Sequence, residues 1–150
     1  MFSLTKIVAA VGLVATSAVA YSGDLTYYTP GLGACGFTNS EADAVVALAV
    51  DQYGNDPNPN NAAVCGRQIA INCETIPPTA HTHRMLHFLC IHQPTHVLTD
   101  DAPDNGKTAI AEVVDKCWGC ASGSIDVSPT VFSQLEDLSA GRVQVSWDFI

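Results

Sequence analysis

The most informative stretch of the chain is VVDKCWGC at residues 113–120, followed closely by IDVSP at residues 125–129. The first segment is a run of β-forming residues that ends in two closely spaced cysteines. The second places one carboxylate between two apolar residues, just before a Ser-Pro pair. Serine followed by proline is a typical helix start, because the serine hydroxyl caps the first turn and proline fits its first position. We therefore predict a strand, a tight cysteine turn and a helix that begins at Pro129.

An apolar stripe at helical spacing follows Pro129, and Gly141 is expected to end this helix. The stripe consists of Phe132, Leu135 and Leu138. Residues 142–150 then alternate between polar and apolar positions, which is typical of a half-buried strand. Its apolar face contains Val143, Val145, Trp147 and Phe149.

The rest of the chain is predicted to be mostly β. We expect strands at residues 24–29, 68–72 and 108–115, because these segments are rich in β-forming residues. Residues 44–50 are apolar throughout and fit either a buried strand or a helix. Residues 53–61 are rich in Asn, Asp and Pro and predict an exposed loop. Several short strands with one late helix predict a small β-barrel.

The charge of the chain restricts its partners. There are 15 acidic and 6 basic residues, which gives a formal net charge of −9. Such an acidic chain is a poor partner for nucleic acid or for an anionic membrane surface. Only 14% of the residues are charged, against about 25% in an average domain. This composition favours an uncharged partner such as a polysaccharide, and it indicates no cofactor. We also expect a monomer.

Residues 1–20 have the pattern of a secretory signal peptide. Lys6 precedes a short apolar run that ends in Ala18-Val19-Ala20, a small-x-small cleavage pattern. The run is too short for a membrane span. Cleavage after Ala20 would leave residues 21–150 as one domain, so we expect a secreted, extracellular protein.

Six cysteines in such a chain indicate disulfides, because the extracellular compartment is oxidising. Our preferred pairing is Cys35 with Cys65 and Cys117 with Cys120, although the sequence does not determine the connectivity. A redox role for the C-x-x-C motif would require a thioredoxin-like βαβ pattern, which is absent from the sequence. A zinc site would require a second closely spaced ligand pair.

Residues 73–103 do not fit the barrel pattern, because they would form a long structureless loop in a compact domain. All five histidines lie here, between His81 and His96. His and Cys suit zinc or copper, but the spacing is irregular, so we predict no metal site.

The codons of this segment suggest a retained intron instead. Cys73-Glu74 can encode a splice donor, Leu98-Thr99 a branch point and Pro103-Asp104 an acceptor. Splicing between them would keep the frame and join Asn72 through a new tyrosine to Asn105-Gly106, a typical hairpin turn. We hypothesise that about residues 73–103 are translated intron. The alternative is a real surface insertion stapled by Cys73 and Cys90.

Two aspartates accompany the cysteine motif. Asp115 ends the predicted strand, where a lone carboxylate is usually solvated. Asp126, between two apolar residues, either caps the following helix or lines a groove in which desolvation raises its pKa. The sequence does not decide between these two roles.

Several segments together resemble a known family. They are GDLTYY (23–28), GLGACG (31–36), VVAL (45–48), CGRQI (65–69), VVDKCWGC (113–120), IDVSP (125–129), Phe132 and GRVQVSWDF (141–149). Their order and spacing resemble the double-psi β-barrel of expansins, rare-lipoprotein-A-like proteins and barwin, and most closely the fungal single-domain loosenins. The resemblance implies an all-β fold over residues 21–150, interrupted at 73–103: a six-stranded double-psi barrel with one or two short helices.

The resemblance also implies a polysaccharide-binding groove. Its substrate-binding residues would be Thr26, Tyr28, Asp115, Trp118 and Asp126. Trp118 would stack on a sugar if it is exposed and would be ordinary packing if it is buried. Asp126 matches the acid of the related family 45 glycoside hydrolases, but Pro30 stands where their base is expected after a Thr-x-Tyr-x-Asp motif. An inverting hydrolase needs both carboxylates, so we expect no catalytic residues, unless another carboxylate faces Asp126 across a sugar-sized gap.

These inferences predict a secreted protein that binds and loosens cell-wall polysaccharide, cellulose or chitin, without hydrolysis. One alternative is a weak glycoside hydrolase or lytic transglycosylase. The other is an inhibitor of cysteine proteases or a defence protein, since barrels of this type also include such proteins. Fold alone does not choose between them.

Overall fold

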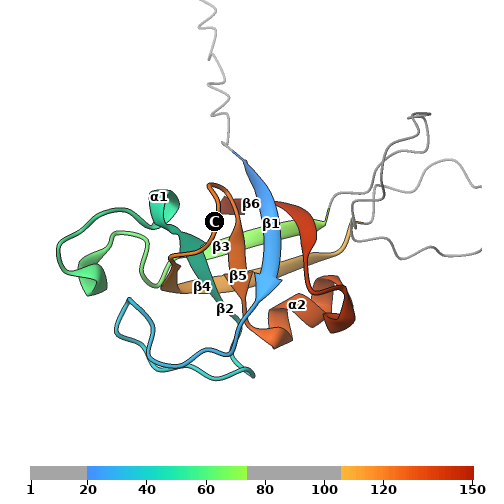
Figure 1. The fold of residues 1–150 in the computed structure, drawn as a ribbon, viewed down its shortest axis with the longest axis horizontal. Helices are drawn as coiled ribbons and strands as arrows, with labels where there is room; N and C mark the ends of the chain where they lie inside the picture. The colour runs from blue at the N-terminus through green and yellow to red at the C-terminus, as the bar shows by residue number, and fades with distance from the viewer. Residues whose placement is uncertain (1–19, 74–105) are drawn as a thin grey trace, which may run out of the picture.

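The computed structural model describes residues 20–73 and 106–150, and in these ranges six strands close into a barrel (Figure 1). The strands are β1 (Tyr21–Tyr27), β2 (Val45–Ala49), β3 (Gln68–Cys73), β4 (Thr108–Cys117), β5 (Ile125–Val127) and β6 (Val143–Phe149). Their order around the barrel is β1-β5-β2-β4-β3-β6. Strand β1 pairs with β5, and β2 with β4, in parallel, whereas the other neighbours are antiparallel. The predicted small barrel is confirmed.

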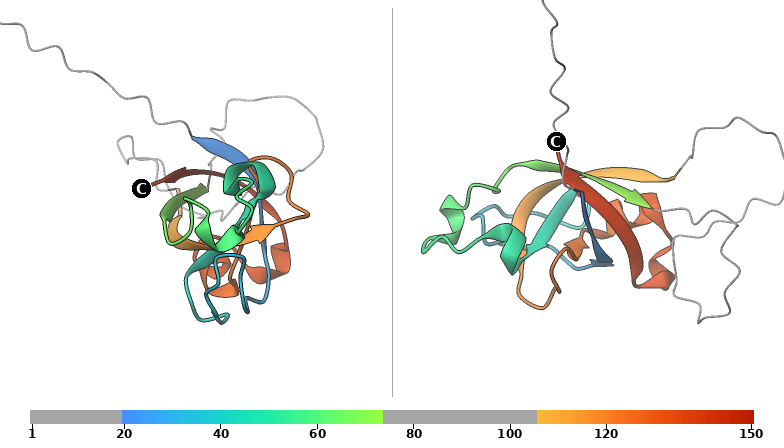
Figure 2. Two further views of the ribbon diagram at one scale, coloured as in Figure 1. Left: turned by 90° about the vertical axis from the view of Figure 1, so that its left-hand side faces the viewer. Right: turned by 90° about the horizontal axis from the view of Figure 1, so that it is seen from above.

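Two short α-helices and two 3₁₀ turns complete the described fold. They are α1 (Val50–Tyr53), α2 (Pro129–Leu135), η1 (Pro59–Asn61) and η2 (Leu138–Ala140). The apolar run at residues 44–50 is therefore a strand that passes directly into a helical turn. Figure 2 shows α2 beside one end of the barrel, where it packs against β1 and β4.

Helix α2 begins at Pro129 as predicted, but two details of that prediction are wrong. The Ser128 hydroxyl is buried without a hydrogen-bond partner, so it does not cap the helix. Instead, the Ser128 carbonyl accepts the backbone N–H groups of the first turn. The helix ends at Leu135, and Gly141, with φ of 67°, ends the separate turn η2.

The barrel core consists of the alternate residues that point inward from the strands. Among those that are almost fully buried are Leu25, Val46, Leu48, Ile69, Ile71, Val113, Ile125, Val127, Val143, Val145 and Trp147. Helix α2 covers this core with its predicted apolar stripe, except that Leu138 lies outside the helix and is exposed. The predicted alternation of the last strand is confirmed, with Phe149 only partly buried at its end.

Both disulfides that we preferred from the sequence are present, Cys35–Cys65 and Cys117–Cys120. The first links the loop after β1 to the segment before β3. The Tyr53 hydroxyl lies 3.4 Å and 3.3 Å from its two sulfurs and donates to the Pro59 carbonyl at 2.8 Å. Tyr53, at the start of the 53–61 segment, is buried because it packs on this disulfide, whereas residues 55–61 are exposed as predicted.

Several sequence predictions concern residues that the structure does not describe. The predicted signal peptide (residues 1–20), except for Ala20, lies outside the described ranges, as do the five histidines and Cys90 in residues 74–105. Cys73 itself is disulfide-bonded. Within the described ranges, no helix is long and apolar enough to span a bilayer.

The ends of strands β3 and β4 meet at the segment that we attribute to an intron. Asn72 pairs with Thr108, and the Cys73 N–H donates to the Lys107 carbonyl at 3.0 Å. When residue 73 pairs with residue 107, only two residues are needed between them for a tight hairpin. The spliced chain would place Asn105-Gly106 there. The register therefore fits the retained-intron hypothesis, which remains a proposal.

We predict that a chain in which residues 73–104 are replaced by one tyrosine folds into the same barrel. Its melting temperature should equal or exceed that of the full chain, because a two-residue turn costs less closure entropy than a long loop. Circular dichroism during heating measures this. A shortened chain that remains unfolded, or a cDNA that retains the segment, would contradict the hypothesis.

Just before β5, the backbone at Gly123 crosses the backbone of β1 at Ser22 and Gly23, so closely that only glycine fits at this crossing. A Cβ on Gly123, which has φ of 78°, would lie 2.4 Å from the Ser22 carbonyl oxygen. A Cβ on Gly23 would lie 2.6 Å from the Gly123 backbone. The Trp147 indole N–H also donates to the Gly123 carbonyl at 2.8 Å inside the barrel. This crossing sets the position of β5 beside β1.

Replacing Gly123 with alanine should therefore lower the free energy of unfolding by about 2 kcal/mol or more. Gly31→Ala is the matched control, because a Cβ at Gly31 meets no atom within 4 Å. Urea titration of both variants measures the difference. Equal stabilities would show that the crossing is not constrained as described.

Candidate functional site

Three strands bring polar side chains into one row on the outer surface of the barrel, and a fourth strand contributes an alanine between them. Thr26 of β1 pairs with Asp126 of β5, and Asp126 pairs with Ala47 of β2. Ala47 in turn pairs with Asp115 of β4. Residues paired across a sheet point to the same side, and the neighbours Leu25 and Ile125 are buried in the barrel. The row therefore faces outward and crosses three strand spacings, roughly 14 Å.

A polar pocket of about 250 Å³ lies over the β1 and β5 end of this row. The Thr26 hydroxyl donates to Asp126 Oδ1 at 3.0 Å across its floor. The pocket is lined by Asp24, Thr26, Cys117, Gly119, Cys120, Ala121, Ser124, Asp126 and Arg142. Of the predicted substrate-binding residues, Thr26 and Asp126 line the pocket directly, whereas Tyr28, Asp115 and Trp118 do not.

Asp126 belongs to strand β5, which the sequence did not reveal because it has only three residues and a polar centre. Its side chain points into the pocket and does not cap helix α2, so the capping alternative is wrong. Desolvation by burial raises the pKa of Asp126 above its ordinary value of 3.8. The Thr26 hydrogen bond and the Arg142 charge oppose that increase. Asp126 is thus a carboxyl group suited to exchange hydrogen bonds or a proton with a ligand.

Tyr28 follows Thr26 on the same face of the chain, as strand alternation predicted. Its backbone N–H continues the pairing with β5 by donating to the Val127 carbonyl at 3.0 Å. Burial, followed by the charges of Asp115 and Asp126, raises the pKa of the Tyr28 hydroxyl well above 10. The phenol therefore stays protonated and can serve as a hydrogen-bond donor close to both carboxylates.

Asp115 is held by the backbone at the far end of the row. Its Oδ1 accepts the N–H groups of Ala34 and Lys116, each at 2.8 Å. Gly33 makes this possible, because a Cβ there would lie 2.3 Å from the Val114 carbonyl oxygen. Asp115 thus ties the loop after β1 to β4, besides facing outward in the row.

Asp24 is a pocket residue that the sequence analysis missed. It accepts hydrogen bonds from the side chains of Arg142 and Gln144, and its N–H donates to the Ser124 hydroxyl at 3.1 Å. The alternation of β1, which places residues 24, 26 and 28 on one face, was a signal that could have identified it. Arg142 and Ser124 come from other strands and loops and carried no such signal.

Two further carboxylates, Asp24 and Asp115, therefore lie on the same face as Asp126, and Asp24 lines the same pocket. Asp24 has both oxygens bonded to side chains of β6 and its preceding turn, and Asp115 has one oxygen bonded to two backbone donors. The expected base position is Pro30, which is buried and has no carboxylate. Asp24 shares the pocket with Asp126, but both of its oxygens already accept hydrogen bonds, and Asp115 does not line the pocket.

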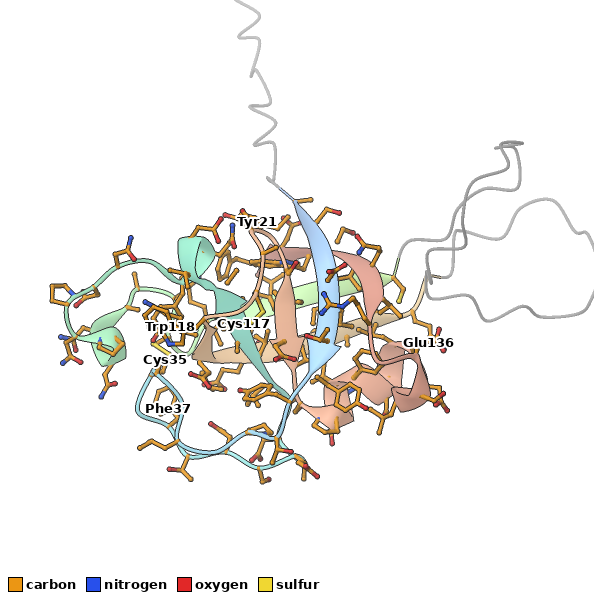
Figure 3. The ribbon with its side chains drawn as sticks, viewed as in Figure 1. Tyr21, Cys35, Phe37, Cys117, Trp118 and Glu136 are labelled. Atoms are coloured by element: carbon orange, nitrogen blue, oxygen red, sulfur yellow. A yellow bond between two sulfur atoms is a disulfide. The ribbon has the colours of Figure 1, made fainter. Side chains whose placement is uncertain are left out.

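Trp118 lies at the rim of the pocket and is exposed, which is the condition under which we expected it to stack on sugar. Its side chain is 79% exposed. The residues on either side of it, Cys117 and Gly119, line the pocket. Figure 3 shows Trp118 beside Cys117, projecting from the barrel on the side of Cys35 and Phe37. Among the described residues, no group of three metal-ligating side chains is present.

The raised pKa of Asp126 has a consequence for stability. The folded state binds the Asp126 proton more tightly than the unfolded chain, so this group makes the protein less stable as pH rises from about 4 through the raised pKa. Asp126→Asn removes that loss and keeps an oxygen that can accept the Thr26 hydrogen bond. The variant should be at least as stable as the wild type at pH 7, and this advantage should disappear below pH 4. Urea titrations at several pH values measure it, and a variant less stable at pH 7 would contradict the prediction.

Comparison with known proteins shows which proteins the chain is similar to. No family model matches it. It is 30% identical over 115 residues to an Asp f 7 allergen homologue of Arthroderma benhamiae and 50% identical over 46 residues to allergen Asp f 7 of Aspergillus fumigatus. These matches cover 76% and 30% of the chain, but only 28% and 17% of the two allergens. It is 23% identical over 141 residues to an EG45-like domain containing protein of Citrus jambhiri, covering 93% of the chain and 88% of that protein.

Solved structures agree with this placement. The Streptomyces papain inhibitor matches with a TM-score of 0.61 and 26% identity, covering 88% of this chain and 94% of the inhibitor. The apo expansin of Clavibacter michiganensis, and a variant of it in complex with cellohexaose, each match with a TM-score of 0.56 and 20% identity. Each match covers 88% of this chain and 50% of the expansin.

The closed six-stranded barrel, together with these structures, defines the fold as a double-psi β-barrel, as the resemblance implied. Within that class, the chain is similar to expansin-like proteins, among them the EG45-like domain containing protein and the Clavibacter michiganensis expansin. The disulfides Cys35–Cys65 and Cys117–Cys120, which require an oxidising compartment, agree with an extracellular protein.

Proposed function

We propose that this is a secreted protein that binds a neutral cell-wall polysaccharide along the outer row of the barrel and does not hydrolyse it. The observation that carries the proposal is the row itself. Thr26, Asp126 and Asp115 come from three strands to one face, next to a polar pocket. The expansin fold that was solved in complex with cellohexaose supports a glycan as the ligand.

The chemistry of the row suits a hydroxyl-rich, uncharged chain. Tyr28 offers a donor, Asp115 and Asp126 offer acceptors, and the row is longer than one sugar ring. The net charge of −9 and the carboxylates of Asp115 and Asp126 disfavour anionic polymers. Binding would loosen a wall by competing for the hydroxyl groups through which polysaccharide chains bind one another.

The absence of hydrolysis in this proposal follows from the carboxylates. Inverting hydrolysis requires an acid and a base on opposite sides of the scissile bond. Asp126 has the raised pKa of an acid, but Asp24 is neutralised by Arg142 and bonded at both oxygens. Asp115 is fixed by two backbone donors. Both candidate bases are thus already engaged by other groups, which supports binding without hydrolysis.

Binding to insoluble cellulose and chitin, with assay of released sugar, tests the proposal. The wild type should be retained on at least one of these glycans and release no reducing sugar. Asp126→Asn should weaken retention about tenfold, because it removes a charge-assisted hydrogen bond. Asp148→Asn on the outer face of β6 is the matched control and should bind normally.

Two outcomes would overturn the proposal. If Asp126→Asn is retained as well as the wild type, the row is not the binding surface. If the wild type releases sugar and the Asp115→Asn or Asp126→Asn variant does not, the protein is a hydrolase or a transglycosylase.

A second candidate function is inhibition of a cysteine protease. It is favoured by the Streptomyces papain inhibitor, which this chain covers almost completely, whereas it covers half of the expansin. A papain assay with the purified protein decides the question. Inhibition that is unchanged in Asp126→Asn, together with no retention on glycans, would replace the first proposal by the second.

A further inference from the structure

Trp118 is exposed to an extent that packing does not explain. At 79% it is the most exposed of the large hydrophobic side chains in the described part of the barrel. Exposed tryptophan is unfavourable in water, and large exposed apolar groups commonly mark binding sites. The other tryptophan, Trp147, is 0% exposed and belongs to the core.

The exposed indole is held in a defined position. The Cys117–Cys120 disulfide closes a four-residue loop around it. The Lys116 ammonium lies 5.0 Å from the centre of the Trp118 ring and 4.6 Å from that of Tyr53. Lys116 is itself only 8% exposed and donates to the Gly54 carbonyl at 2.8 Å. A buried, anchored cation thus supports the indole, and little conformational entropy remains to be lost when a ligand contacts it.

The indole is also continuous with the polar pocket. Cys117, Gly119 and Cys120 of the same loop line that pocket together with Thr26 and Asp126. A chain that occupied the pocket and extended past this loop would meet the Trp118 ring. A ligand that filled only the pocket would not need it.

We propose that Trp118 forms a second subsite, which stacks on another ring of the polysaccharide whose neighbouring part occupies the pocket. This inference rests on the proposed function and adds a requirement for chain length. It also specifies the sugar. Pyranoses whose ring substituents are all equatorial can present a C–H face to an aromatic ring from either side, whereas an axial hydroxyl interrupts one of the two sides. The subsite therefore favours β-linked glucose or N-acetylglucosamine chains over mannose chains, in which the axial hydroxyl interrupts one side of each ring.

The two tryptophans of the chain allow a direct test with the intact protein. Acrylamide should quench the fluorescence of exposed Trp118 and spare buried Trp147. Cellohexaose or chitohexaose should protect the quenchable fraction, and mannohexaose should protect it much less. Cellobiose and chitobiose, which fit the pocket alone, should also leave it quenchable.

The variant Trp118→Ala should weaken binding of the protecting hexasaccharide about fivefold to tenfold, the size of a stacking contact, and leave disaccharide binding unchanged. Trp118→Tyr should recover part of the affinity. Leu32→Ala, which removes another side chain that is 76% exposed, is the matched control and should have no effect.

The outcomes separate this inference from the function on which it rests. If Trp118→Ala binds hexasaccharide as the wild type does while Asp126→Asn does not, the groove stands and the second subsite is wrong. If neither variant changes binding, both proposals fail. If Trp118→Ala loses papain inhibition but not glycan binding, the exposed indole serves a protein partner and the subsite is again wrong.

Discussion

The parallel pairing of β1 with β5 is the constraint on which the candidate site depends. It brings Thr26 and Asp126, which are 100 residues apart, to a hydrogen bond of 3.0 Å. The pairing is possible because Gly23 and Gly123 cross with no space for a Cβ on either. Every other contact of the pocket, from the Asp24–Arg142 ion pair to the disulfide loop, is arranged around these two strands. A side chain at Gly23 or Gly123 would push β1 and β5 apart and so separate Thr26 from Asp126.

Asp126 shows how the barrel keeps a polar group at some cost to its stability. Burial between apolar neighbours raises the pKa of this carboxyl, and a neutral asparagine would fit the same space. A residue that lowers stability and points into a pocket is the pattern expected of a functional group. Thr26 and Arg142 reduce the cost by a hydrogen bond and by charge, so the group remains available to a ligand without being left unpaired.

The double-psi barrel itself does not specify a function. Its relatives by structure include an inhibitor of papain and an expansin, and the same scaffold therefore presents different surfaces to different partners. In this chain the informative surface is the outer row that joins the pocket at one end, with an exposed tryptophan at the rim. Polar groups that converge beside an aromatic face suit a carbohydrate, because each sugar ring has both hydroxyl edges and apolar faces.

Much of the architecture followed from sequence alone, since the alternation of residues 142–150, the Ser-Pro helix start and the cysteine spacing are local signals. These patterns specify which face of a strand is buried and where turns occur. Strand β5 and the pocket residues Asp24, Ser124 and Arg142 became apparent only in the folded barrel. Register between distant strands depends on backbone hydrogen bonds and close glycine contacts, and no local pattern encodes them. The chemical character of the site was thus present in the chain, whereas closure of the barrel decided which residues meet there.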